Sequence, residues 1–168
     1  GPQGALYDIT LAAQEAAIAA TKPGNTFIQP HEAALKVLTQ GLLDEKLLKL
    51  SELGSLDNAI ESGAYRRFYM HRTSHWLGMD VHDVGSYREP LGSVQGSAQE
   101  KPWRVLKPGM VLTIEPGLYI RPADDVDSAF WNIGIRIEDD AVVNINGCEL
   151  ISRGVPVKAD EIEALMKN

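Results

Sequence analysis

Residues 111–120 read VLTIEPGLYI, and this stretch decides the expected fold. Its β-branched and apolar residues predict a β-strand that a Pro-Gly pair interrupts near its middle. Because strand side chains alternate between faces, Leu112 and Ile114 take one face while Thr113 and Glu115 take the other. A carboxylate at the end of an apolar strand is expected to be partly buried, and a buried carboxylate needs a hydrogen-bonding partner or a metal ion.

A second short stretch, GIRIE at residues 134–138, repeats this pattern. It predicts a strand with Arg136 and Glu138 on one face, followed by a turn at Asp139-Asp140. An ion pair on a solvated sheet face explains Arg136 and Glu138 equally well. For Glu115, a buried structural carboxylate with hydrogen-bond donors is also open.

The rest of the chain is predicted from periodicity and turn residues. The expected elements are a helix over 6–20 ended by Pro23-Gly24, a helix from Pro30 that fades near 51–56, a short helix over 57–61, a long surface loop over 87–108, a β-hairpin with Asn146-Gly147 between strands 141–145 and 148–152, and a helix over 159–167. Helices first, then strands, then a helix indicate an α+β fold with helices on one face of an antiparallel sheet.

Three of the four histidines, His71, His75 and His82, fall within residues 71–85 together with two aspartates. A histidine-rich loop with no special role is the plain interpretation for any one of them. Their concentration beside several small residues favours chemistry, because histidine is the commonest metal ligand and the usual acid or base near neutral pH.

One histidine and two strand-borne glutamates, Glu115 and Glu138, form a plausible oxygen-rich metal site. Such a ligand set suits Mn²⁺, Co²⁺ or Zn²⁺ better than copper. A bound metal would lower the pKa of a water molecule and polarise a carbonyl, and the remaining histidines would bind substrate or move protons.

Composition narrows the class of protein. The 168 residues include 16 basic and 23 acidic side chains, a net charge of −7, so we expect no nucleic-acid partner. We also expect no membrane span and a cytoplasmic location, because no apolar run is long enough and the single Cys148 forms no internal disulfide. Residues 1–4, GPQG, are typical of a tag-removal scar and lead-in, which leaves 5–168 as the folded part.

Three blocks of this sequence resemble the Xaa-Pro aminopeptidases, also called aminopeptidase P. They are residues 71–85, HRTSHWLGMDVHDVG; residues 106–120, LKPGMVLTIEPGLYI; and residues 134–140, GIRIEDD. The blocks stand in the order of that family and with compatible spacing, and the resemblance extends over nearly the whole chain.

The resemblance implies a pita-bread fold, two divalent metal ions that are usually Mn²⁺, and hydrolysis of the bond between an N-terminal residue and a following proline. By motif, it makes His75, Glu115 and Glu138 metal ligands, with Glu115 also shuttling a proton. It implies that His71 and His82 contact the peptide substrate and stabilise the charge that develops in the reaction. It places Tyr119 and Arg136 beside the metals as supporting groups.

The family pattern also has two aspartate ligands upstream of the first helix, and this sequence lacks them. Asp8 falls inside the predicted helix and is interpreted as an ordinary helix residue. The chain therefore resembles the C-terminal half of the catalytic domain. Alone, it is expected to bind at most one metal weakly, to have little or no peptidase activity, and to form a homo-oligomer through the apolar surface that its missing half would cover.

Two alternatives stay open. A prolidase would share the fold and metals but act only on Xaa-Pro dipeptides. A pita-bread protein without catalysis would only bind a partner, although such a protein has no need of His71, His75, His82, Glu115 and Glu138 together.

Overall fold

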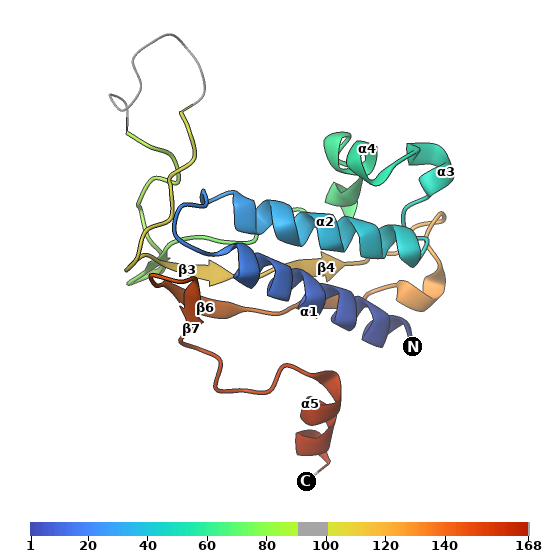
Figure 1. Cartoon of the computed structure of the whole chain (residues 1–168). Coiled ribbons are helices and arrows are strands. Elements are labelled where there is room, and N and C mark those ends of the chain that lie inside the picture. The colour runs from blue at the N-terminus through green and yellow to red at the C-terminus, as the bar shows by residue number, and fades with distance from the viewer. Residues whose placement is uncertain (91–100, 168) are drawn as a thin grey trace.

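The computed structural model describes residues 1–90 and 101–167, and Figure 1 shows helices layered against a curved set of strands. In chain order the elements are α1 (Pro2–Ala20), α2 (Gln29–Asp44), α3 (Leu50–Leu53), α4 (Leu56–Glu61), the 3₁₀ turn η1 (Ala64–Arg67), β1 (Leu77–Gly78), β2 (Val81–His82), β3 (Val111–Ile114), β4 (Gly117–Tyr119), the 3₁₀ turn η2 (Ser128–Phe130), β5 (Gly134–Arg136), β6 (Asp139–Val143), β7 (Cys148–Leu150) and α5 (Ala159–Met166). The order of helices and antiparallel strands is that of the predicted α+β fold.

Helix α1 buries the predicted apolar stripe, with Leu6, Ala13 and Ala17 fully inaccessible. It begins at Pro2, four residues before the predicted start, because proline is favoured in the first turn of a helix. Residues 2–4 are thus helical, and their interpretation as a tag scar stays a prediction.

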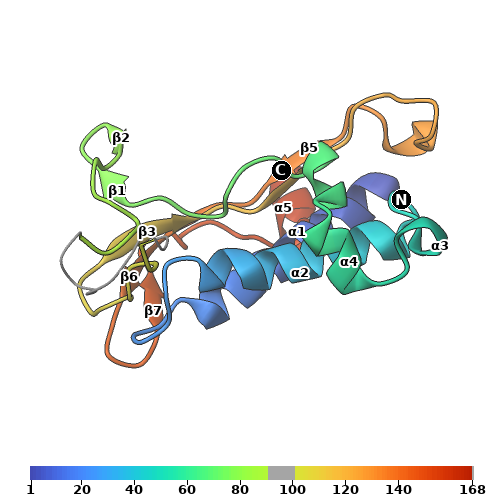
Figure 2. The same cartoon turned by 90° about the horizontal axis from the view of Figure 1, so that it is seen from above.

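Helices α1 and α2 lie side by side against the strands, as Figure 2 shows from above. A Cβ atom at Gly41 of α2 would lie 2.5 Å from Cγ2 of Ile9 in α1, so glycine permits this close approach. The buried face of α2 includes Leu35, Leu38 and Leu42, as its spacing predicts.

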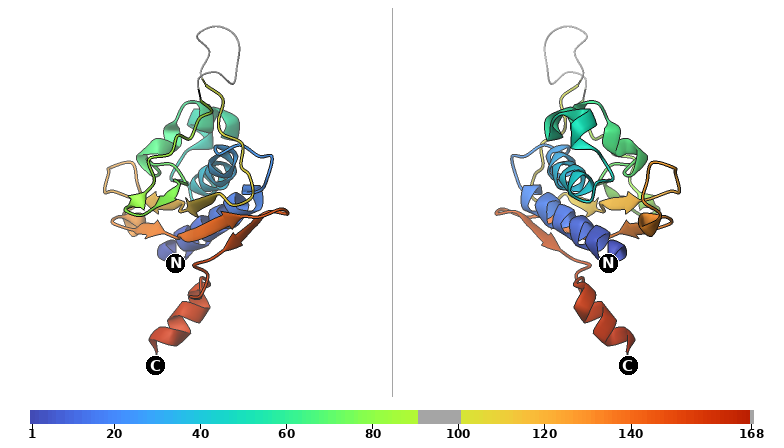
Figure 3. Two further views of the ribbon diagram at one scale, coloured as in Figure 1. Left: turned by 90° about the vertical axis from the view of Figure 1, so that its left-hand side faces the viewer. Right: turned by 90° about the vertical axis from the view of Figure 1, so that its right-hand side faces the viewer.

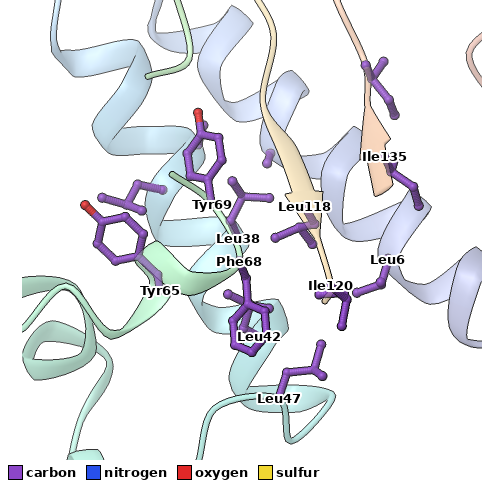
Figure 4. Packing of buried hydrophobic residues seen from close by; sticks show 14 of the residues in the cluster. Leu6, Leu38, Leu42, Leu47, Tyr65, Phe68, Tyr69, Leu118, Ile120 and Ile135 are labelled. Carbon is purple, nitrogen blue, oxygen red and sulfur yellow. The ribbon is translucent and has the colours of Figure 1, made fainter. Parts of the chain in front are cut away.

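The main hydrophobic core forms where these helices meet the strands. Figure 4 shows Leu6 of α1 and Leu38 of α2 facing Leu118 of β4. Phe68, which follows η1, is 1% exposed and closes the core from the side of the short helices.

Strands β3 and β4 are two halves of one interrupted strand, as predicted, and β6 and β5 pair with them in turn. Ile114 lies opposite Asp139, and Gly117 lies opposite Arg136, so the antiparallel register is the same on both sides of the break. At the break, the Ile137 N–H donates to the Pro116 carbonyl over 3.3 Å. This continuous register brings Glu115 and Glu138 opposite each other.

The prediction for residues 134–140 was wrong in detail. Strand β5 ends at Arg136, and the expected turn at Asp139-Asp140 is instead the start of β6. Adjacent acids favour turns, but the Asp139 side chain is buried and accepts hydrogen bonds from Gln14 and Ser152. Tertiary partners therefore outweigh the local preference.

The predicted hairpin around Asn146-Gly147 is confirmed by the antiparallel pairing of β6 with β7. Its connection has four residues, because Val143 lies opposite Cys148; β6 lies two residues earlier than predicted, and β7 is two residues shorter. Asn144 explains the wider loop: its Oδ1 accepts from the N–H groups of Asn146 and Gly147, both over 2.9 Å.

The structure tests only part of the predicted surface loop over 87–108, because residues 91–100 lie outside the described residues. On the described flanks, Arg88 pairs with Trp103 in a β-bridge and Leu106 is 1% exposed. The end of this segment is thus part of a small second core, in which Phe27 stacks on Tyr87 at 4.5 Å between ring centroids.

Helix α5 ends the described chain, and Figure 3 shows it standing apart from the other layers. It was predicted over 159–167, and none of its residues is buried. The Tyr7 hydroxyl donates to the Val157 carbonyl over 2.7 Å and ties the preceding segment to α1. Among the described helices, none has both the length and the apolar character needed to cross a membrane.

Candidate metal centre

Strand β3 brings two predicted ligands together. Residues 73–76 run antiparallel beside it, with the Thr113 N–H donating to the His75 carbonyl over 2.9 Å and the Glu115 N–H to the Thr73 carbonyl over 2.7 Å. The His75 Nε2 atom thereby lies 3.1 Å from the Glu115 Oε1 atom. Glu138 approaches from the opposite strand, and one donor atom of each of the three residues lies within 4.8 Å of the other two.

The chemistry of this group fits a cation. The His75 Nδ1 atom lies 2.9 Å from the Trp76 carbonyl oxygen, which only accepts, so Nδ1 holds the proton of a neutral ring. Nε2 is then an acceptor that faces the acceptor Oε1 of Glu115 across 3.1 Å. Two acceptors this close need a proton or a metal ion between them, and a second carboxylate beside them, that of Glu138, favours a divalent metal.

Thr113 connects the two ligands and is itself 1% exposed. Its hydroxyl accepts from the His75 N–H over 3.1 Å and donates to Glu115 Oε1 over 3.0 Å. The sequence placed Thr113 on the same face as Glu115 but gave it no role. A polar residue inside an apolar strand, two positions before a ligand, was the available signal.

Glu138 is the least compensated carboxylate of the group. Partial burial raises its pKa, and repulsion from Glu115 and Asp140 adds to that effect, while Arg136 and His75 oppose it. Within the described part of the chain, its carboxylate has no hydrogen bond or ion pair. The site therefore concentrates negative charge that a cation would neutralise.

Arg136, Tyr119 and His71 form a hydrogen-bonded group beside the ligands. Arg136 donates from Nε to the Tyr119 hydroxyl over 2.7 Å and from an Nη atom to Glu115 Oε2 over 3.2 Å. His71 Nδ1 bonds to the Arg72 carbonyl over 2.8 Å, so its Nε2 accepts from the Tyr119 hydroxyl over 2.8 Å. The donor and the acceptor of each hydrogen bond in this group are therefore assigned. The cationic Arg136 donates both to Tyr119 and to the predicted metal ligand Glu115.

Two features of this group have physical causes in the chain. A Cβ atom at Gly117 would lie 2.6 Å from the Tyr119 hydroxyl, so the glycine after Pro116 lets this ring fold back over the strand. The pKa of Arg136 is raised although burial opposes it, because the Tyr119 hydrogen bond and the charges of Glu115 and Glu138 outweigh desolvation.

His82 reaches the same centre from the β1–β2 hairpin and is exposed there. Its ring centroid lies 4.2 Å from that of His75. The hairpin is fixed by the Asp83 N–H, which donates over 3.0 Å to the Trp76 carbonyl, the same oxygen that orients His75. All seven predicted site residues therefore lie around one centre, although His71 reaches the ligands only through Arg136.

His31 is a half-buried histidine near this centre for which the sequence contained no signal. Burial, with electrostatic contributions from Arg72 and His71, lowers its pKa from 6.5 to about 4. Its Nδ1 atom lies 3.0 Å from the Thr73 hydroxyl oxygen. It stands alone on α2, outside any motif, and only the tertiary fold brings it here.

The fold and the clustered ligand set are those of a metallopeptidase. The model of metallopeptidase family M24 matches residues 1–144, and the chain belongs to this family. It is 42% identical over 165 residues to the Xaa-Pro aminopeptidase of Haemophilus influenzae, covering 98% of this chain and 35% of that protein. The Xaa-Pro aminopeptidase of Escherichia coli is also 42% identical, over 98% of this chain and 34% of its own length.

Solved structures agree with these relatives. The Pseudomonas aeruginosa aminopeptidase PepP superposes with a TM-score of 0.87 at 47% identity, covering 99% of this chain and 35% of that one. Aminopeptidase P from E. coli with the inhibitor Pro-Leu gives a TM-score of 0.84 at 41% identity, over 99% and 34%. The predicted resemblance and the α+β pita-bread fold are confirmed, and the chain spans about a third of the length of these relatives.

Proposed function

We propose that this chain is part of the catalytic domain of a hydrolase, a metal-dependent Xaa-Pro aminopeptidase, and contributes three of its metal ligands. The supporting observation is the 3.1 Å approach of two acceptor atoms, His75 Nε2 and Glu115 Oε1, beside the uncompensated Glu138. A structural ion pair between His75 and Glu115 would need no second carboxylate at this position.

His75, Glu115 and Glu138 would hold the metal, which when bound lowers the pKa of a coordinated water and polarises the scissile carbonyl. The carboxylate-rich set suits Mn²⁺, with Co²⁺ or Zn²⁺ as the other candidates. The family pattern has two further aspartates without counterparts in this sequence. We therefore propose two metals for the parent enzyme and at most one, weakly bound, for this chain.

The surrounding side chains would handle charge and protons. Glu115 is placed to take and return a proton, because Thr113 and Arg136 already hold its two oxygens in a fixed orientation. His71 and His82 would contact the peptide and stabilise negative charge that develops on it. Tyr119 donates to His71 Nε2 and accepts from Arg136, so it would hold the His71 ring in a fixed orientation beside the substrate.

Calorimetric titration of this chain with Mn²⁺ tests the metal assignment. We expect weak binding of no more than one ion, which Glu138→Ala abolishes and the control Glu149→Ala, on the exposed face of β7, leaves unchanged. Equal binding by both variants, or none by the wild type, would contradict the assigned ligands.

Hydrolysis of an Xaa-Pro-Xaa tripeptide with Mn²⁺ tests the activity, and we expect no turnover by this chain alone. Turnover that Glu138→Ala abolishes would show that the chain completes its site in another way, such as across a dimer. On the full-length parent, cleavage of longer peptides favours an aminopeptidase, cleavage of dipeptides alone favours a prolidase, and no cleavage favours a non-catalytic binding protein.

We also propose that the isolated chain forms a homo-oligomer. Supporting this, Met79 and Val84 on the β1–β2 hairpin are fully exposed, although they are large and apolar. Light scattering checks the solution mass, and a strictly monomeric, folded chain would contradict the proposal. The cytoplasmic location stays a prediction, supported by a single thiol, Cys148.

A further inference from the structure

A pocket that does not include the metal ligands is lined in part by His71. Its volume is about 210 Å³, and its lining residues are His31, Tyr65, Arg66, Tyr69, Met70, His71 and Arg72. None of the three metal ligands lines it, and neither does any aspartate or glutamate. In a chain of net charge −7, a pocket lined by two arginines and two histidines without an acid is unusual.

The positive charge of this pocket has no internal counterion. Two arginines elsewhere are paired with carboxylates: Arg67 donates to both oxygens of Asp125, over 2.6 and 2.9 Å, and Arg153 binds the buried Asp139. Within the part of the chain that the structure describes, Arg66 and Arg72 have no such carboxylate. Arg72 instead packs its guanidinium 5.0 Å from the centre of the Trp103 ring.

The hydrogen bonds beneath the pocket settle which nitrogen of His31 holds the proton. The Tyr69 side chain is fully buried, and its hydroxyl lies 2.7 Å from Thr73 Oγ1, its one hydrogen-bond partner among the described residues. A buried O–H has to donate, so Tyr69 donates to Thr73. The Thr73 hydroxyl then donates to His31 Nδ1 over 3.0 Å.

His31 therefore holds its own proton on Nε2, the nitrogen left over for the pocket that the ring lines. The arginines contain donors and no acceptor, so Arg66, Arg72 and His31 line the pocket with N–H donors. Figure 4 shows the rings of Tyr65 and Tyr69 at the margin of the apolar cluster, and both residues line the pocket. Such an arrangement excludes cations and matches the acceptor oxygens of an anion.

We propose that this pocket binds one oxyanion group, a carboxylate or a phosphate, through Arg66, Arg72 and the Nε2–H of His31. Guanidinium groups bind both anions through short charge-assisted hydrogen bonds, and the volume admits one such group. The pKa of His31 is lowered mainly by burial and secondarily by Arg72 and His71, which keeps the ring neutral and its Nε2–H available as a donor. The inference goes beyond the aminopeptidase activity and does not depend on it.

The test is an NMR titration of the His31 ring in the chelator-treated chain with inorganic phosphate, at constant pH and ionic strength. We expect saturable shifts, and a higher pKa of His31 at saturation because a bound anion favours the imidazolium. Arg66→Gln and Arg72→Gln should each weaken phosphate binding by roughly tenfold. Arg121→Gln, which removes an exposed arginine that does not line the pocket, is the matched control and should change affinity less than twofold.

A short peptide with a free or an amidated C-terminus distinguishes the two sources of the anion. Shifts with the free-acid peptide alone, or with phosphate alone, each support the pocket and identify its ligand. No saturable shift with either ligand overturns the proposal, and so does an equal loss of affinity in Arg66→Gln and Arg121→Gln. Arg66 is exposed, so its replacement leaves the core intact. A loss of phosphate binding in Arg66→Gln is therefore not explained by unfolding.

Discussion

Glu138 and Asp139 are consecutive residues whose carboxylates meet opposite environments. Asp139 is 3% exposed, and both its oxygens accept hydrogen bonds, from Ser152 over 2.8 Å, from Gln14 over 3.1 Å and from Arg153. Glu138 faces Glu115 and Asp140 and has no such donor in the described residues. Strand geometry causes the difference, because successive side chains point to opposite faces of the sheet.

Asp139 is therefore a carboxylate that stabilises the fold, whereas Glu138 is a carboxylate available to bind a metal ion. The Asp139 network joins three distant segments, since Gln14 comes from α1 and Arg153 follows β7, and Arg153 also donates to Gln14 over 2.9 Å. At the metal centre, Glu138 has no hydrogen bond or ion pair among residues 1–90 and 101–167. Replacing each carboxylate should therefore change stability in opposite directions.

The largest effect is expected from Asp139→Ala, which leaves Arg153 and Gln14 without their shared acceptor inside the protein. Breaking a buried ion pair from one side costs about 3–5 kcal/mol. Urea unfolding measures the loss. Asp140→Ala is the control and should change the free energy of unfolding by less than about 1 kcal/mol; similar losses in the two variants would contradict the assigned role of Asp139.

The Asp139 network also shows which part of the fold could not be predicted from the sequence. The periodicity of α1 and α2 and the Pro-Gly break between β3 and β4 were predictable, because each depends on nearby residues. The strand at Asp139 was not, since its donors lie 125 and 14 residues away along the chain. Local acid content favours a turn there, and only the fold supplies Gln14 and Arg153.

The same limit applies to the site. His75, Glu115 and Glu138 could be selected from motifs and strand alternation, and the structure places them within reach of one ion. Thr113 and His31 had no assigned role, because their importance comes from a hydroxyl between two ligands and from burial against Thr73. Residues that orient a metal ligand are harder to predict from the sequence than the ligand itself.

The comparison extends to the histidines, because His31 is half-buried and neutral whereas His75 faces a carboxylate. The pKa of His31 falls from 6.5 to about 4 on folding. The unfolded chain thus takes up a proton between these values while the folded chain does not, so stability is full above pH 6.5 and falls as the pH decreases towards 4. We expect His31 to account for about 2 kcal/mol of this loss.

Urea unfolding of the wild type and His31→Gln at pH 7 and near pH 4.5 checks this contribution. The variant should lose less stability on acidification, because its amide takes up no proton. If both chains lose stability equally between the two pH values, His31 is not held in its neutral form and the assignment fails.

Thr113→Val sharpens the difference between the two regions by removing a hydroxyl that orients ligands. We expect Mn²⁺ affinity to fall by roughly tenfold and stability by about 1 kcal/mol, since His75 and Glu115 lose one hydrogen bond each. Calorimetry measures the Mn²⁺ affinity, and urea unfolding measures the stability. Thr39→Val is a matched control, because the buried Thr39 hydroxyl has no hydrogen-bond partner among the described residues. An equal loss of metal affinity in Thr39→Val would contradict the role assigned to Thr113.

The smallest expected effect has the opposite sign. Glu138→Gln removes a charge that Glu115 and Asp140 repel, so the metal-free variant should be more stable than the wild type at pH 7, by about 0.5 kcal/mol at most because Glu138 is exposed to solvent. The raised pKa of Glu138 means that the folded chain takes up this proton more readily than the unfolded chain. The advantage of the variant should therefore shrink as the pH falls through the pKa of Glu138, since the wild type then becomes neutral at this position too.

Adding Mn²⁺ should reverse the order of the two proteins. Metal binding stabilises the folded state in proportion to its affinity, and the amide of Glu138→Gln is a poorer ligand than the carboxylate. Thermal unfolding with and without Mn²⁺ measures the reversal. If Glu138→Gln is less stable than the wild type without metal, Glu138 is, like Asp139, a carboxylate that the fold needs. If the variant is more stable than the wild type without metal and less stable with it, Glu138 is a position where this chain gives up stability in order to bind an ion.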